Sequence, residues 1–113
     1  MTCYFIDNES YFKRESLYGY YDEAERFAFF CRAVLEAIPY LDFIPDILHC
    51  HDWQTGMIPV LLEAQYRQSA PYGKMATIFT VHNLKYQGEF PLPVFREMFG
   101  LGEEYFTPDK LEF

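Results

Sequence analysis

The amino-acid sequence predicts an α/β fold, a parallel sheet with flanking helices, and two observations support this prediction. First, strand-like apolar runs alternate with helix-like amphipathic runs in the order β–α–β–α–β–α, which is typical of parallel strands joined by right-handed crossovers. Second, the strand-like runs end in the polar clusters Asp7–Asn8, His51–Asp52 and His82–Asn83. If the strands are parallel, their carboxyl ends lie at one edge of the sheet, so we expect all three clusters to lie along one rim. Ligands of such sheets bind beyond this edge.

The first part of the chain predicts one strand and one long helix. Residues 2–6 (TCYFI) are typical of a short strand, and the tyrosine-rich residues 8–23 follow as a loop. Apolar residues then recur at helical spacing, so residues 23–38 are predicted to form an amphipathic helix. Asp22 is suited to cap this helix, with Glu25 as its capping-box partner.

The middle of the chain predicts a second strand and a second helix. The run ILHC, residues 47–50, is typical of a short strand. A helix is expected over much of residues 53–67, although Pro59 lies inside it and proline disrupts a helix interior. Two alternatives remain open: either the turn at residues 53–56 is separate, or the main helix begins near Pro59.

The last part of the chain contains the clearest strand. Residues 77–81 (TIFTV) are rich in the β-branched side chains that favour extended backbone. Pro91 and Pro93 then open a short helix, and Gly100 ends it. No regular element is expected in the tail, residues 107–113.

The composition argues against several classes of protein. The chain of 113 residues suits one domain at most, and half of it is hydrophobic, which argues against disorder. The net charge of −8 disfavours nucleic acid as a partner, because an acidic chain repels phosphate backbones. No apolar run approaches the roughly 20 residues needed to span a membrane.

The cysteines and the N-terminal charges predict a cytoplasmic protein. The three cysteines are odd in number and have no CxxC spacing, so reduced buried thiols are expected rather than disulfides. Asp7, Glu9, Lys13 and Arg14 come too early for a signal peptide.

The residues that follow the second strand have two interpretations each. Asp52 either caps a helix or provides a carboxylate at the mouth of a cleft, and the pattern does not choose. His49 and His51 lie two positions apart in a strand, so both side chains face one side and could reach a metal. Zinc needs three or four ligands, however, and no spacing supplies the rest, so we expect no metal.

His82 and Asn83 make a stronger candidate site. They end a fully apolar strand and precede Tyr86, Gln87 and Gly88. A histidine and an amide offer hydrogen-bond donors and acceptors suited to sugar hydroxyl groups. The alternative is a loop histidine that the backbone satisfies. Four aromatic side chains could stack on a sugar face, or pack as ordinary core and loop residues: Phe12, Tyr18, Trp53 and Tyr86.

Two long stretches of the chain resemble signature stretches of the glycogen synthases and bacterial starch synthases. They are PDILHCHDWQTGMIPVLL and TIFTVHNLKYQGEFP, in the same order and at a similar separation. The stretches IDNESYFKRESLYGY, ERFAFFCRAVLEAIPYL and YFTPDKLEF also resemble the family pattern. The resemblance covers essentially the whole chain.

The resemblance implies a reaction and a fold. Members of the family transfer glucose from ADP-glucose, or from UDP-glucose in some relatives, to the non-reducing end of an α-1,4-glucan. They retain the anomeric configuration and need no metal or other cofactor. Their fold is GT-B, in which two Rossmann-like domains face each other across a cleft.

The resemblance also implies roles for individual residues. His82 is expected to hydrogen-bond the donor glucose and to support an oxocarbenium-like transition state, and Asn83 to contact the same sugar. Asp52 and Trp53 are expected to line the acceptor side of the cleft. Phe12 stands where related enzymes carry an acceptor-contacting tyrosine, and it lacks that hydroxyl. Three further residues are expected to bind substrate: Tyr86, Gln87 and Gly88.

The resemblance implies that residues 1–113 are part of the N-terminal Rossmann-like domain. The family's Lys-Thr-Gly-Gly loop and its second domain have no counterpart in this sequence. Because substrate positioning and charge stabilisation supply much of the rate of transfer, we expect the isolated chain to be inactive. An incomplete sheet exposes strand edges and apolar faces, so we also expect self-association.

Two other functions remain as alternatives. One is a freestanding flavodoxin-like α/β module that binds a small polar ligand at its rim. The other is a metal-assisted hydrolase built on His49, His51 and His82.

Overall fold

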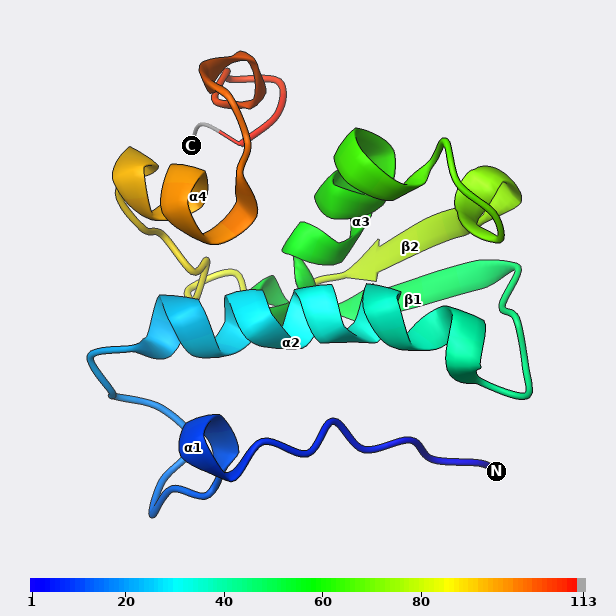
Figure 1. Ribbon diagram of the computed structural model, residues 1–113. Helices are drawn as coiled ribbons and strands as arrows, with labels where there is room; N and C mark the ends of the chain where they lie inside the picture. The colour runs from blue at the N-terminus through cyan, green and yellow to red at the C-terminus, as the bar shows by residue number, and fades with distance from the viewer. Residues whose placement is uncertain (112–113) are drawn as a thin grey trace.

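A two-stranded parallel sheet packed against helices forms the centre of the protein (Figure 1). The structure is a computed structural model, which describes residues 1–111. Strand β1 (Ile47–His51) pairs in parallel with strand β2 (Ala76–Thr80), and His51 lies opposite Thr80. Both strands and their common direction were predicted from the sequence, so the α/β parallel arrangement is confirmed.

Helix α2 (Glu23–Ala37) supplies one side of the core and continues into a 3-10 turn, Ile38–Tyr40. This agrees with the prediction of a helix over residues 23–38. Asp22 is the N-cap residue, as predicted, but the predicted side-chain cap is absent, because the Asp22 carboxylate makes no bond to the helix N-terminus. Its carboxylate instead accepts two hydrogen bonds from Arg14, at 2.8 and 3.1 Å, and these hold the pKa of Asp22 below its usual value.

The crossover from β1 to β2 is divided into three helical pieces. A 3-10 turn (Trp53–Thr55) comes first, then helix α3 (Met57–Leu61), then a π-helical turn (Leu62–Tyr66). The separate first turn is therefore the correct alternative. Pro59 is the third residue of α3, where a missing backbone N–H costs no helical hydrogen bond.

Helix α4 (Leu92–Phe99) lies across the end of α2, and Gly100 ends it with a left-handed backbone, φ 65°. Gln65 donates a hydrogen bond of 2.7 Å to the Phe99 carbonyl, and Arg32 donates one of 3.3 Å to the same oxygen. The last carbonyl of α4 is thereby tied to α2 and to the crossover. Within residues 1–111 no helix is both long and apolar enough to cross a membrane.

Short turns connect these elements and follow them. Residues Tyr72–Lys74 form a 3-10 turn before β2, and Glu103–Tyr105 form another after α4. The predicted tail continues in turns to Leu111. The last two residues of that tail lie outside the described part.

The N-terminal segment differs from its prediction. Residues 2–6 form no strand, and Figure 1 draws them as an open trace beside α2, away from the sheet. A run with strand propensity becomes a strand only where a neighbour takes its backbone hydrogen bonds. Asn8 instead caps a short helix, α1 (Glu9–Phe12), by accepting from the Tyr11 N–H at 3.0 Å.

Arg26 fastens the tyrosine-rich loop to α2. Its side chain is only 2% exposed. The guanidinium donates to the carbonyl of Tyr11 at 2.7 Å and to that of Leu17 at 3.1 Å. A buried charge needs such partners, so the loop's path depends on Arg26.

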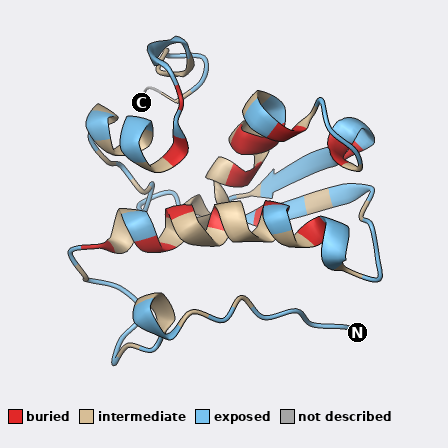
Figure 2. Ribbon diagram, in the orientation of Figure 1, coloured by how far each residue is buried: buried red, intermediate tan, exposed pale blue. Residues whose placement is uncertain are grey.

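The two faces of the sheet differ in exposure. Helices α2 and α3 pack together over one face, to which β1 contributes the buried Cys50. Ile47 and Ile78 on the other face remain 52% and 47% exposed. Figure 2 shows the same contrast: the buried residues are concentrated in the helices, whereas the strands are mostly pale blue, which marks exposed residues. The core cluster comprises Ala28, Cys31, Leu35, Ile38, Cys50, Ile58, Leu61, Leu62, Tyr66, Tyr72, Met75, Phe99 and Leu101.

We predict that the chain produced alone self-associates through the uncovered face of the sheet. Removing exposed apolar surface from water drives such association. Ile78→Lys should shift the chain toward monomer in sedimentation velocity at micromolar concentration. Tyr40→Lys is the matched control, because Tyr40 is 88% exposed but lies in the turn after α2. A wild-type chain that sediments as a monomer would contradict the prediction.

Candidate functional site

The carboxyl ends of β1 and β2 meet at one rim, which we define as residues 51–53 and 81–83. The Asp52 N–H donates to the Thr80 carbonyl at 2.9 Å. The Asp52 carboxylate in turn accepts the backbone N–H of His82 at 2.7 Å. The predicted meeting of these two polar clusters is confirmed. The third cluster, Asp7–Asn8, belongs to the N-terminal segment, and its predicted place on the rim is wrong because residues 2–6 do not join the sheet.

Asp52 has the only left-handed backbone among the non-glycine residues that the structure describes, with φ 60° and ψ 178°. L-residues rarely adopt this conformation because it strains the backbone. Residues with strained backbone are found most often at functional sites. The carbonyl of Asp52 accepts the Thr55 N–H at 3.2 Å, and the Thr55 hydroxyl donates to the His51 carbonyl at 2.8 Å. Asp52 makes no side-chain cap to the turn that follows, so its carboxylate serves the rim.

Three histidines form a row on the uncovered face of the sheet. His49 and His51 face the same side, as predicted, with ring centroids 4.2 Å apart. The planes of the His51 and His82 rings are inclined by 19°, and Nδ1 of His51 lies 3.0 Å from Nε2 of His82. Nε2 of His49 lies 2.8 Å from the Thr80 hydroxyl.

The row does not have the geometry of a metal centre. In residues 1–111 no group of three or more His, Cys, Asp or Glu side chains is placed to hold a metal ion. The rings instead contact one another in succession, with centroids 4.2 Å apart for His49 and His51 and 5.3 Å apart for His51 and His82. This arrangement gives no support to the metal-assisted hydrolase.

The loop that follows β2 takes its shape from its own amide side chains. Oδ1 of Asn83 accepts the Lys85 N–H at 3.1 Å, and the Asn83 carbonyl accepts the Tyr86 N–H at 3.3 Å. The Gln87 amide donates to the Leu84 carbonyl at 3.0 Å. Asparagine favours such turns because its side chain bonds to the backbone two residues on.

Gly88 brings this loop onto the indole of Trp53. Its φ is +64°, and a Cβ at this position would lie 2.6 Å from Cδ2 of Trp53. Trp53 also packs edge-to-face on Phe27, with centroids 5.0 Å apart, and lies 5.9 Å from Phe90. The indole is therefore the contact between α2, the rim and the loop.

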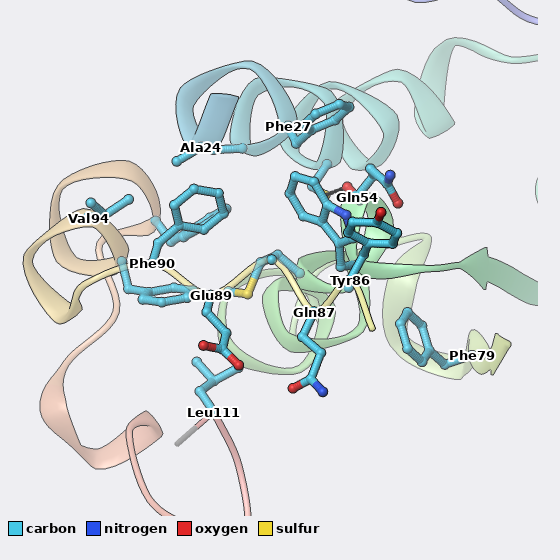
Figure 3. Close-up of a pocket in the computed structure, with 18 of the residues that line it drawn as sticks. Ala24, Phe27, Gln54, Phe79, Tyr86, Gln87, Glu89, Phe90, Val94 and Leu111 are labelled. Atoms are coloured by element: carbon cyan, nitrogen blue, oxygen red, sulfur yellow. Dashed lines mark hydrogen bonds between the residues drawn. The ribbon is translucent and has the colours of Figure 1, made fainter. Parts of the chain in front are cut away.

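A cavity of about 510 Å³ lies beside Trp53, between α2, the loop after β2 and α4. In Figure 3, Ala24 and Phe27 approach it from α2, and Phe90 and Val94 approach it from the region of α4. We call it the aromatic cavity. Four predicted site residues line it: Trp53, Tyr86, Gln87 and Gly88. His82, Asn83 and Asp52 are not among its lining residues.

Two of the three thiols are buried, and burial disfavours their ionisation. Cys31 lines the aromatic cavity, and burial raises the pKa of its thiol to about 12, which keeps it protonated. Burial also raises the pKa of the Cys50 thiol. Cys3 is exposed, so the prediction of buried thiols is wrong for that residue because the N-terminal segment does not enter the core.

Phe12 lies apart from the other predicted site residues. It ends α1, and its ring packs on α2, with centroids 6.2 Å from Phe29 and 6.4 Å from Phe30. It is not among the residues that line the aromatic cavity.

Some residues at the site were missed by the sequence prediction. The sequence suggests no role for His51 beyond that of a metal ligand, yet His51 pairs with His82. The parallel register contains the signal, since His51 lies opposite Thr80, two residues before His82. Phe27 and Phe90 line the aromatic cavity, and neither is among the site residues predicted from the sequence.

We predict that Asp52→Gly is more stable than Asp52→Ala. Both variants lose the carboxylate that holds the His82 N–H, but only glycine relieves the left-handed strain. The difference should be about 1–3 kcal/mol in the free energy of unfolding, measured by urea denaturation. Equal stability of the two variants would show that the Asp52 backbone is not strained.

We predict that Gly88→Ala displaces the loop from Trp53. The matched control is Gly19→Ala, because Gly19 also has positive φ, +93°, but has no atom within 4 Å of an added Cβ. The control should lose about 1–2 kcal/mol from backbone strain alone. Gly88→Ala should lose more and shift the fluorescence of Trp53, the only tryptophan in the chain. Equal losses and an unchanged emission spectrum would refute the clash.

The chain matches known proteins along its whole length. The family model for the starch synthase catalytic domain covers residues 1–113. The glycogen synthase of Anoxybacillus flavithermus is 53% identical over 113 residues, which are 100% of this chain and 23% of that protein. The glycogen synthase of Geobacillus stearothermophilus is 58% identical over 110 residues, 97% of this chain and 23% of that protein. The chain therefore spans about a quarter of the length of these relatives.

A solved structure gives the same result for the fold. The catalytic domain of starch synthase IV from Arabidopsis thaliana, determined with ADP and acarbose bound, matches with a TM-score of 0.75 and 37% identity. The match covers 88% of this chain and 20% of that one. It confirms the expected fold class, the Rossmann-like α/β arrangement of GT-B glycosyltransferases, and does not favour a freestanding flavodoxin-like module. The chain belongs to the starch synthase catalytic domain family.

Proposed function

We propose that this chain is part of a retaining glucosyltransferase that moves glucose from ADP-glucose to the non-reducing end of an α-1,4-glucan. The observation that carries the proposal is the rim, where the Asp52 carboxylate holds the backbone of His82 at 2.7 Å. It occurs in a chain that belongs to the starch synthase family and is 58% identical to a glycogen synthase. ADP bound to the Arabidopsis relative supports an ADP-sugar donor.

The chain's place in that enzyme is the N-terminal Rossmann-like domain. The rim then forms one wall of a cleft, and a second domain forms the other wall and holds the nucleotide diphosphate. This division of work follows from the chemistry, because the leaving diphosphate needs its charge stabilised while the glucose is positioned.

His82 and Asn83 are the residues we assign to the donor glucose. The His82 ring is exposed at the rim, and an imidazole can hydrogen-bond a sugar hydroxyl. The Asn83 side-chain oxygen is engaged by Lys85, so its NH₂ group is the part directed to the sugar. Asp52 contributes by holding His82 and by its negative charge, which favours an oxocarbenium-like transition state.

Four residues of the aromatic cavity form the proposed acceptor side. They are Trp53, Tyr86, Gln87 and Gly88. Tyr86 is 61% exposed, which leaves its ring available for stacking on a glucan. Acarbose bound to the Arabidopsis relative supports a saccharide acceptor. The packing of Phe12 on α2 gives no support to an acceptor contact for that residue.

The cytoplasm is the compartment we infer. Cys31 and Cys50 are free buried thiols, which is the usual state of cysteine in a reducing compartment. ADP-glucose and the glucan are the expected partners.

The test uses a segment chimera, which is the Geobacillus stearothermophilus glycogen synthase with this chain in place of its 110 matched residues. His82→Ala in the chimera should lower transfer of radiolabelled glucose from ADP-glucose to glycogen by more than tenfold, or about 1.4 kcal/mol of barrier. A smaller loss of transfer rate would show that His82 has only a structural role and would contradict its assignment to the donor glucose.

Two controls accompany this measurement. Tyr40→Ala in the chimera should keep the parent rate, because Tyr40 is 88% exposed in the turn after α2. The 113-residue chain alone should incorporate no glucose above background. Turnover by the isolated chain would contradict the proposed sharing of the site between two domains.

A further inference from the structure

The pairing of His51 with His82 has a consequence for which nitrogen of His82 can face a ligand. Nδ1 of His51 lies 3.0 Å from Nε2 of His82, and the planes of the two rings are inclined by 19° with centroids 5.3 Å apart. This is the distance of a hydrogen bond between two imidazoles. One ring nitrogen of His82 is thereby occupied within the protein.

Both rings are anchored through the backbone. His51 is the last residue of β1, in register with Thr80, and its carbonyl accepts the Thr55 hydroxyl at 2.8 Å. The backbone N–H of His82 is bound to Asp52, the residue next to His51. The separation of the two rings is therefore set by the sheet and the strained turn.

The side chains on either side of His51 complete the arrangement. The His49 ring lies against His51 with centroids 4.2 Å apart, and its own Nε2 pairs with the Thr80 hydroxyl. His51 is thus held between two rings. Its Nδ1 is directed to His82.

We propose that His51 is a positioning residue that holds the ring of His82 with Nδ1 toward the hexose. A neutral imidazole has one donor nitrogen and one acceptor nitrogen, and the bond made by one nitrogen fixes the tautomer at the other. Because Nε2 is engaged by His51, Nδ1 is the nitrogen that remains for a sugar hydroxyl. The proposal rests on the assignment of His82 to the donor glucose.

Loss of this pairing should affect the rate more than substrate binding. A ring of His82 that rotates freely still forms part of the site surface, but it spends less time in the productive orientation. The expected signature is a fall in kcat with little change in KM.

His51→Phe is the informative variant, and His51→Asn is its conservative partner. Phenylalanine keeps a planar ring between His49 and His82 but has no nitrogen to pair with. Asparagine places an amide near the position of Nδ1 and can restore the hydrogen bond. In the segment chimera, His51→Phe should lower kcat more than tenfold with KM within about twofold, and His51→Asn should recover most of kcat. Equal activity of the two variants would overturn the proposal.

A spectroscopic measurement tests the same pairing without catalysis. Long-range ¹H–¹⁵N correlation spectra of the ¹⁵N-histidine-labelled segment chimera distinguish the two tautomers of His82. We expect one dominant tautomer in the chimera with His51 and a mixture in its His51→Phe variant. An unchanged His82 spectrum in His51→Phe would refute the pairing.

The chimera also separates this proposal from the proposed function. If His82→Ala keeps its activity, the assignment of His82 to the donor fails, whatever His51 does. If His82→Ala loses activity while His51→Phe keeps its kcat, only the positioning role of His51 fails.

Discussion

The hydrogen bond from the His82 N–H to the Asp52 carboxylate joins the ends of the two strands, and the rest of the rim depends on it. Its length of 2.7 Å and its charge place it among the stronger hydrogen bonds of a protein. It offsets the strain of a residue held at φ 60°. Once Asp52 is fixed, the direction in which the chain leaves β1 is fixed as well, and with it the position of Trp53.

Trp53 transmits this constraint from the rim to the helices. Its indole contacts Phe27 of α2 on one side and the loop of Gly88 on another. The three consecutive residues His51 to Trp53 thus connect the histidine row on the uncovered face, which contains His51, with the aromatic cavity on the helix side, which Trp53 lines. A rigid connection of this kind fixes the position of the rim relative to the aromatic cavity, and the positioning of bound groups supplies much of the rate of enzyme reactions.

The elements that local sequence predicts well are those whose hydrophobic pattern is strong. Helix α2 and strands β1 and β2 have such patterns, and the structure places them close to the predicted bounds. Residues 2–6 have strand propensity but no neighbouring strand within residues 1–111, so they remain unpaired. Asp22 is a residue type that favours side-chain capping, yet the Arg14 guanidinium binds its carboxylate instead.

The sequence by itself determined the order of the elements from α2 to α4, the parallel direction of β1 and β2, and the meeting of Asp52 with His82. These follow from hydrophobic periodicity and from the rule that parallel strands end at one edge. Only the tertiary structure decided that His51 pairs with His82 and that Gly88 rests on Trp53. Such contacts depend on strand register and on the path of the crossover, which arise from packing between distant segments rather than from any local pattern.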